Sequence, residues 1–370
     1  VAIVVYIGLA LAAAWLFKIL PHGYVPTQDK QYLVGFAQLP PGSSLDRTDA
    51  VLQRMSEIAL KTPGVQNAVG LPGLSISFGA TSSMGVVFFP LDPFEERATD
   101  DLYGPAIAEK LMAQMGGIED AFVGIFPPPA VDGMGAIGGF KLQIQDRSDK
   151  GYDELYNVLQ QVQMKAWQTP ELANVFSSYQ INVPQLDVGV DRTKAMQLGV
   201  PLSNIFDTMQ IYLGSLYIND FNLFGRTYQV VAQADAPFRD DASDIAQLKT
   251  RSLTGEMVPL GSLVSVTPGY GPDTASRYNL YRTAELNGGA AQGFSSGDAE
   301  NAIMKILADT LPQGMSFEWT DLKYQQILAG NTMIYVFPLC VFLVFLVLAA
   351  QYESLMLPLI IILIVPVVVL

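Results

Sequence analysis

Cysteine and histidine are almost missing from this chain of 370 residues, which contains one of each, Cys340 and His22. A lone cysteine cannot build a disulfide framework within the chain. One cysteine in an apolar run and one distant histidine also cannot supply a catalytic Cys–His pair. The H-E-x-x-H motif and the P-loop are absent, and we expect no hydrolase nucleophile elbow. We therefore predict a protein without catalytic residues, cofactor or bound metal.

Basic residues are also scarce, with 21 Lys and Arg against 35 Asp and Glu. Nucleic acids select basic surfaces, so this balance argues against a nucleic-acid partner. All acidic residues except Glu353 and all basic residues except Lys18 lie in residues 22–330. We expect this charged segment to be a water-soluble region of two or more domains. Its acidic cluster at 92–96 beside Arg97 is predicted to be a solvated approach to a helix.

Three apolar runs flank the charged segment: residues 1–20, 332–350 and 357–370. The second run has about 19 residues without a charge, which as a helix reaches about 29 Å, close to the thickness of a bilayer core. Only a short polar stretch, QYESLM, separates the second and third runs, so we expect a helical hairpin in the membrane. The chain starts without methionine and is still apolar at Leu370. We therefore expect both ends to lie inside a longer protein.

A repeated β-α-β pattern runs through the charged segment. Extended apolar stretches alternate with helices whose apolar residues are three and four positions apart, as in Val51, Leu52 and Met55. The pattern occurs four times and predicts ferredoxin-like subdomains with helices on one face of a mixed sheet. Residues 184–271 interrupt it with short β-rich runs, which we interpret as an inserted domain. The predicted fold class is an α+β membrane protein.

Residues 70–85 (GLPGLSISFGATSSMG) show no regular pattern between two predicted strands. Their glycine, serine and threonine content is typical of a flexible surface loop. The segment also holds Leu74, Ile76 and Phe78, which are unusual in a merely solvated loop. A mobile loop with apolar side chains would suit a site for variable apolar ligands.

Several stretches together resemble the resistance-nodulation-division efflux pumps, and most closely the hydrophobe/amphiphile subfamily, the tripartite multidrug exporters of Gram-negative bacteria. The resemblance covers the whole chain in the family's order and places it in the C-terminal half of such a pump. The matching stretches are 36–44 (FAQLPPGSS), 126–146 (FPPPAVDGMGAIGGFKLQIQD), 176–188 (FSSYQINVPQLDV), 198–230, 318–331 (EWTDLKYQQILAGN) and 348–366 (LAAQYESLMLPLIIILIVP).

This resemblance implies a domain organisation. The apolar runs 1–20, 332–350 and 357–370 correspond to the seventh, eighth and ninth transmembrane helices, the last of them incomplete. The charged segment between them would face the periplasm. Its expected parts are a first porter subdomain at 28–150, a second at 151–183 and 272–325, and a docking or funnel subdomain at 184–271.

The resemblance also indicates residues that meet substrate. The family's deep drug pocket is lined by aromatic and apolar side chains, and a glycine-rich switch loop separates it from an entrance pocket. The switch loop corresponds to residues 70–80, with Gly70, Gly73 and Gly79. An apolar residue on a strand is more often a core residue, so both interpretations stay open. The positions that match substrate-contacting ones are Val34, Phe36, Leu74, Phe78, Phe88, Phe140, Leu142 and Ile144.

Pumps of this family are homotrimers that work with a periplasmic adaptor protein and an outer-membrane channel. They exchange protons for hydrophobic and amphiphilic drugs taken from the periplasm or from membrane lipid. The resemblance therefore implies a drug:proton antiporter, not an enzyme, that crosses the Gram-negative inner membrane several times. The family's proton relay uses two aspartates and a lysine on helices that this chain does not include.

Two other functions on the same fold remain as alternatives. A heavy-metal exporter would need methionine, histidine or carboxylate ligands at one site, whereas the 13 methionines here are scattered and His22 stands alone. A membrane protein that assists protein translocation would share the fold, but the extensive match within residues 184–271 argues against it.

Overall fold

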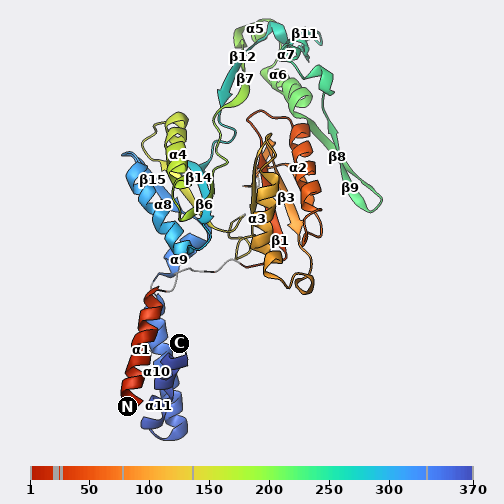
Figure 1. The fold of residues 1–370 in the computed structure, drawn as a ribbon. Coiled ribbons are helices and arrows are strands. Elements are labelled where there is room, and N and C mark those ends of the chain that lie inside the picture. Colours follow the sequence, from red (N-terminus) through yellow and green to blue (C-terminus); the bar gives the residue numbers. More distant parts are fainter. Residues whose placement is uncertain are drawn as a thin grey trace. The chain divides into compact units, whose positions relative to one another are not determined.

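Figure 1 shows the computed structural model, which describes residues 2–19, 25, 28–76, 79–135, 137–330 and 332–368. The chain divides into two compact units, one of residues 1–181 with 272–370 and the other of residues 182–271. Within its described residues, the larger unit contains a group of apolar helices and two α/β subdomains.

The apolar runs form the helices α1 (Ala2–Ile19), α10 (Thr332–Tyr352) and α11 (Met356–Val368). Helix α11 contacts both α1 and α10. Among the described residues, one helix is long and apolar enough to cross a membrane, α10 over Tyr335–Tyr352. The short helix α9 (Asp321–Ala329) precedes α10. The membrane-spanning roles of α1 and α11 stay predictions.

The first α/β subdomain has the order strand, helix, strand, strand, helix, strand. Its strands form one antiparallel sheet in the order β2-β3-β1-β4, a split β-α-β arrangement. Leu33 and Ala37 of β1 pack under the two helices, whereas Val34 and Phe36 point to the opposite face. The elements are β1 (Tyr32–Gln38), α2 (Leu45–Ala59), β2 (Val69–Leu74), β3 (Ala80–Pro90), the 3-10 turns Phe94–Glu96 and Asp100–Leu102, α3 (Gly104–Met115) and β4 (Phe122–Phe126).

The second α/β subdomain repeats this order around the inserted unit. Strand β14 pairs with β5 and β6, and β15 pairs with β5, all antiparallel. Leu155, Leu159 and Leu307 of its two helices pack on Leu142 and Ile144 of the sheet. The elements are β5 (Phe140–Asp146), α4 (Tyr152–Trp167), β6 (Leu172–Phe176), β13 (Arg277–Tyr278), β14 (Tyr281–Ala290), α8 (Ser296–Thr310) and β15 (Met315–Trp319).

The smaller unit begins and ends on two paired strands. Strand β7 (Val183–Val190) lies antiparallel to β12 (Val264–Gly271), with Val183 opposite Gly271. A small core of Ala195, Val200, Ile205, Leu260 and Leu263 lies beside them. The other elements are α5 (Arg192–Gln197), α6 (Leu202–Met209), the π-helical turn Gln210–Gly214, β8 (Leu216–Leu223), β9 (Arg226–Ala232), the 3-10 turn Ala236–Phe238, α7 (Asp244–Gln247), β10 (Lys249–Arg251), β11 (Met257–Pro259) and the 3-10 turn Leu260–Ser262.

The interpretation of residues 70–85 as a flexible loop was wrong for most of the segment. Strand β2 extends to Leu74 and β3 starts at Ala80, so the two form a hairpin. The Ser75 backbone N–H donates to the Gly79 carbonyl at 2.8 Å, and the Gly79 N–H donates to Ser75 Oγ at 2.9 Å. Gly73 has a positive φ of 83° where the register shifts, a conformation that glycine adopts at low cost. Gly73 therefore allows a bulge in β2, and Ser75 and Gly79 close the turn of the hairpin.

Glu95 and Glu96 of the acidic cluster are exposed, as predicted, whereas Arg97 beside them is buried. Its side chain is 1% exposed and pairs with Asp29, which is 6% exposed, at 2.8 Å between Nη1 and Oδ2. The Nε of Arg97 donates to the Asp92 carbonyl at 2.7 Å. Arg97 thus points inward from the acidic turn and fixes the segment before β1.

Candidate functional site

The first sheet carries an apolar cluster on the face opposite its helices, which we call the aromatic face. Phe36 at its centre is fully buried and stacks on Phe126, with ring centroids 5.8 Å apart. Phe176, from β6 of the second subdomain, lies 4.6 Å from the Phe36 ring and joins the two subdomains. The buried members of the aromatic face are Val34, Phe36, Ile76, Met84, Val86, Phe126 and Phe176.

Gly124 on β4 makes this packing possible. The strand register places it opposite Phe36. A Cβ atom at position 124 would lie 2.5 Å from the Phe36 ring and 2.7 Å from the Phe126 ring. A glycine is therefore needed where the backbone of β4 passes so close to the aromatic rings.

Four of the predicted substrate residues belong to this cluster. Val34 and Phe36 are buried in it, and Leu74 and Phe88 are half-buried at its edge. Phe78 lies outside the described residues. Of the three switch-loop glycines, Gly70 and Gly73 lie on β2, and Gly79 closes the turn of the β2–β3 hairpin. A substrate-binding role for these residues stays a prediction.

The other three predicted residues lie on the covered face of the second sheet. Leu142 and Ile144 are fully buried beneath α4 and α8, and Phe140 is 7% exposed. Their burial favours a core role over contact with substrate. The opposite face of β5 and β14 is polar, with Lys141, Gln143, Thr283 and Glu285. Sequence reasoning missed this face, although the alternation of Lys141 and Gln143 with the apolar residues was the available signal.

A polar cavity of about 280 Å³ lies between the β2–β3 hairpin and this polar sheet face. Met84 contributes to both this cavity and the aromatic face, so the two are neighbours. The remaining wall comes from the residues after β6, from the segment before β14 and from β14 itself. The lining residues are Ser75, Gly79, Ala80, Thr81, Met84, Gln143, Ser178, Tyr179, Asp273, Thr274, Ser276, Arg277, Tyr278, Thr283 and Glu285.

Hydrogen bonds hold the side chains of this wall in place. Ser178 Oγ donates to Glu285 Oε1 at 2.6 Å, and Lys141 Nζ lies 3.1 Å from Glu285 Oε2. Thr283 Oγ1 lies 2.9 Å from Gln143 Oε1. Burial, with a smaller effect of Tyr152, raises the pKa of Tyr179 above its ordinary value. Such an arrangement of hydroxyl, amide and charged groups suits reversible binding of a polar ligand.

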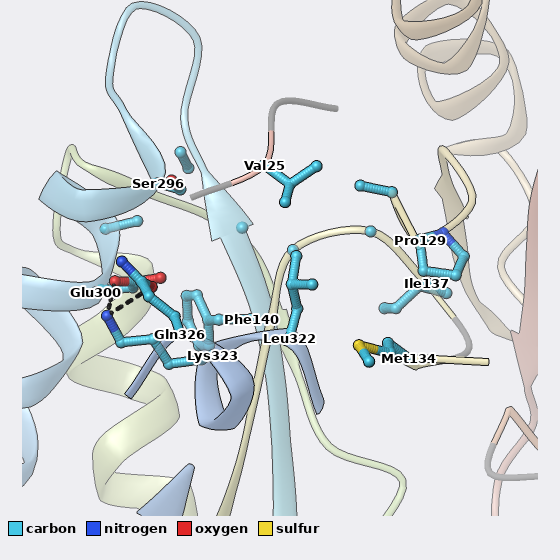
Figure 2. A pocket seen from close by; sticks show the side chains of 16 residues that line it. Val25, Pro129, Met134, Ile137, Phe140, Ser296, Glu300, Leu322, Lys323 and Gln326 are labelled. Carbon is cyan, nitrogen blue, oxygen red and sulfur yellow. Dashed lines mark hydrogen bonds and ion pairs between the residues drawn. The ribbon is translucent and has the colours of Figure 1, made fainter. Parts of the chain in front are cut away.

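A second, smaller cavity of about 80 Å³ lies beside Phe140. Figure 2 shows Glu300, Lys323 and Gln326 on one side of it and Met134 and Ile137 on the other. Lys323 forms an ion pair with Glu300 and donates to Gln326 Oε1 at 3.0 Å. The pair connects α8 to α9, and so connects the second subdomain to the segment that leads into α10.

The spacing G-x-S-x-G does occur, at residues 293–297 (GFSSG), contrary to the expectation that no nucleophile elbow is present. Ser295 is the N-cap of α8: its Oγ accepts the Asp298 backbone N–H at 3.1 Å and donates to Asp298 Oδ2 at 2.7 Å. This is a capping box, which explains the serine through helix formation rather than catalysis.

The sequence profile of the AcrB/AcrD/AcrF family matches residues 1–370. The chain belongs to this family. The predicted membership of the resistance-nodulation-division efflux proteins is thereby confirmed, and membership makes the chain part of a membrane protein with a periplasmic porter domain.

Curated members of the AcrB/AcrD/AcrF family give the same result. The chain is 35% identical over 367 residues to the multidrug export protein AcrF of Escherichia coli K12, a match that covers 98% of the chain and 35% of AcrF. It is 34% identical to the toluene efflux pump membrane transporter TtgB of Pseudomonas putida, over 98% of the chain and 34% of TtgB. Identity to the multidrug resistance protein MdtF of E. coli K12 is 34%, over 98% of the chain and 35% of MdtF. The chain thus spans about a third of the length of these relatives.

Proposed function

We propose that this chain is the substrate-handling part of a drug:proton antiporter that exports hydrophobic and amphiphilic compounds across the inner membrane of a Gram-negative bacterium. The observation that carries this proposal is the aromatic face beside the polar cavity, with the β2–β3 hairpin bordering both. An apolar surface next to hydrogen-bonding groups suits ligands that are part apolar and part polar. The names of AcrF, TtgB and MdtF as export, efflux or resistance proteins support the same function.

The domain assignment follows the family. We assign residues 28–150 to one ferredoxin-like porter subdomain and residues 151–183 with 272–325 to a second. Residues 184–271 form the docking subdomain, and 1–20, 332–350 and 357–370 are membrane helices. The repeated split β-α-β order and the separate compact unit of residues 182–271 support this assignment.

Substrate access to the aromatic face requires a rearrangement of its centre. Phe36 is fully buried, and the Phe176 ring packs against it. A substrate can therefore reach Phe36 only when Phe176, on β6, moves away. The turn that closes the β2–β3 hairpin takes the place of the switch loop, and Phe78 remains its predicted aromatic residue. An apolar groove of about 490 Å³ lies between α10 and α11. This groove supports the proposal that membrane lipid surrounds these helices.

The proposed assembly is a homotrimer that binds a periplasmic adaptor protein and an outer-membrane channel. The β8–β9 hairpin supports an assembled state because its large apolar side chains are exposed, Phe224 at 88%. An isolated hairpin with apolar side chains in water is marginally stable, and a partner would cover it.

The function is tested by dye accumulation in bacteria that lack their own major efflux pumps. The full-length protein that contains this chain is expected to lower accumulation of a fluorescent apolar dye. Phe36→Ala and Phe176→Ala should restore accumulation. Phe122→Ala should have a smaller effect, because the Phe122 ring lies 5.9 Å from the Phe36 ring but is half-exposed. Equal accumulation with and without the full-length protein would overturn the proposal.

Residues 1–370 alone should leave accumulation unchanged. Proton coupling needs ionisable groups within the membrane, and α1, α10 and α11 contain no aspartate or glutamate. Lower accumulation in cells that make only these residues, at an expression level matched by immunoblot, would contradict this expectation.

A further inference from the structure

The polar cavity carries two charges that no described side chain neutralises. Asp273 and Arg277 both line it. In the part of the chain that the structure describes, neither the Asp273 carboxylate nor the Arg277 guanidinium has an ion-pair partner. The other carboxylate of the wall, Glu285, lies 3.1 Å from Lys141 Nζ and is thereby neutralised.

The backbone around the two unpaired charges is fixed at both ends. The Asp273 N–H donates to the Gln180 carbonyl at 3.1 Å. Arg277 lies in β13, where it pairs with Arg282 of β14, and its Nη1 donates to the Leu280 carbonyl at 3.0 Å. Asp149 forms an ion pair with Arg282 instead. One negative and one positive group therefore stand a few residues apart on one anchored segment of the wall.

The rest of the wall is neutral. Gln143, Ser178 and Thr283 offer hydrogen bonds, and Met84 leads from the cavity to the aromatic face. A ligand that matches this wall has a cationic group for Asp273, an anionic group for Arg277 and an apolar part that extends past Met84. A ligand with a single charge would satisfy one of the two groups and leave the other in water.

We propose that this cavity selects zwitterionic amphiphiles, with Asp273 and Arg277 as the residues that determine charge specificity. The inference deepens the proposed function, because it names the substrate class of the same binding region. It differs from the expectation that substrate contacts are apolar, since here charge decides which compounds enter.

Three dansyl compounds of matched size test the proposal. Nε-dansyl-lysine carries both charges, dansylcadaverine lacks the carboxylate, and 6-(dansylamino)hexanoate lacks the ammonium group. Binding is measured by dansyl fluorescence with the full-length protein that contains this chain, in lipid nanodiscs. Because each exposed charge contact adds a modest increment, we expect Nε-dansyl-lysine to bind about two- to fivefold more tightly than either singly charged compound.

Two variants test the roles of Asp273 and Arg277 separately. Asp273→Asn should weaken Nε-dansyl-lysine and dansylcadaverine and leave 6-(dansylamino)hexanoate unchanged, whereas Arg277→Gln should weaken Nε-dansyl-lysine and 6-(dansylamino)hexanoate and leave dansylcadaverine unchanged. Asp46→Asn and Arg47→Gln, on the exposed first turn of α2, are matched controls that should change none of the three. Thermal unfolding verifies that every variant is folded.

Equal affinity of the wild-type chain for the three compounds would overturn the proposal. So would an equal loss for all three compounds in either cavity variant. The binding assay needs no transport, and the dye assay for export uses an uncharged apolar compound. The proposed function and the charge specificity can therefore fail independently.

Discussion

At the scale of single residues, Asp29 and Arg97 form a buried ion pair in the first subdomain. The guanidinium contacts both carboxylate oxygens, at 2.8 Å and 3.2 Å. Asp29 also accepts the backbone N–H groups of Gln31 and Gly104, at 2.9 Å and 2.7 Å. Arg97 Nη1 donates further to the Leu102 carbonyl at 2.9 Å. These bonds tie the segment before β1 to the start of α3, and such bidentate, charge-assisted contacts are both strong and directional.

Asp29→Asn is expected to destabilise the chain at neutral pH. Burial by itself would raise the pKa of Asp29, but the hydrogen bonds from Arg97, Gln31 and Gly104 and the Arg97 charge together lower it below its ordinary value of 3.8. The charged carboxylate therefore stabilises the fold above pH 3.8, and this contribution disappears as the pH falls through the lower folded-state pKa. Removing one partner of a buried pair costs about 3–5 kcal/mol. Thermal unfolding as a function of pH measures the effect.

The difference in Tm between wild type and Asp29→Asn should be large at pH 7 and should shrink at acidic pH once Asp29 takes up a proton. Asp120→Asn is the matched control, because Asp120 pairs with Arg54 at the exposed surface, where ion pairs contribute little. A Tm difference that is small at pH 7, or that grows towards acidic pH, would show that Asp29 does not act through its charge.

At the scale of elements, the two faces of β5 differ in what they should do. Leu142→Ala is expected to cost about 2–5 kcal/mol, because it leaves a cavity in a closed core. Gln143→Ala, the neighbouring position on the polar face, should leave stability nearly unchanged and weaken binding of polar ligands in the cavity. Thermal unfolding and a dansyl titration distinguish the two. If Leu142→Ala kept its Tm and lost ligand binding, Leu142 would be a pocket residue after all.

The alternation of side chains along β5 shows what a sequence pattern can predict and what it cannot. Alternation identifies two faces of a strand, but the helices that cover one of them are set by chain connections and sheet order. Alternation predicted that Val34 and Phe36 share one face of their strand, and the structure shows that this is the face away from the helices. Family resemblance placed Leu142 on a pocket wall, whereas its strand turns that side towards α4 and α8.

Other features depend on contacts between distant residues, which a local pattern does not contain. The β2–β3 hairpin was missed because glycine and serine usually favour loops, whereas here pairing with β3 provides the hydrogen bonds of the extended strand. The buried role of Arg97 was missed because Asp29 is 68 positions away. In contrast, the helices α2 and α8 were predictable, since apolar residues repeat at helical spacing in both and a serine caps each of them, Ser44 and Ser295.

At the scale of the whole molecule, the unit of residues 182–271 should be separable from the rest. It has its own apolar core, and it begins and ends on paired strands, with Val183 opposite Gly271. Residues paired in an antiparallel sheet have Cα atoms about 4.5–5.5 Å apart. Ile181 lies two positions before Val183 and Pro272 follows Gly271, so a short linker can connect Ile181 and Pro272 without strain.

Replacing residues 182–271 with a short Gly-Ser linker is therefore expected to leave the larger unit folded, with a Tm within a few degrees of the full chain. Trp167 reports on this, because its indole donates to the Val175 carbonyl at 2.7 Å within the second subdomain, and its fluorescence should be retained. Deleting α8 instead removes the core residues Ile303 and Leu307 and should abolish cooperative unfolding. If the linker variant also lost its unfolding transition, the second subdomain would depend on the inserted unit for its fold. In that case the second subdomain would depend on the paired strands β7 and β12. They would bring its two halves, β5–α4–β6 and β14–α8–β15, together in register.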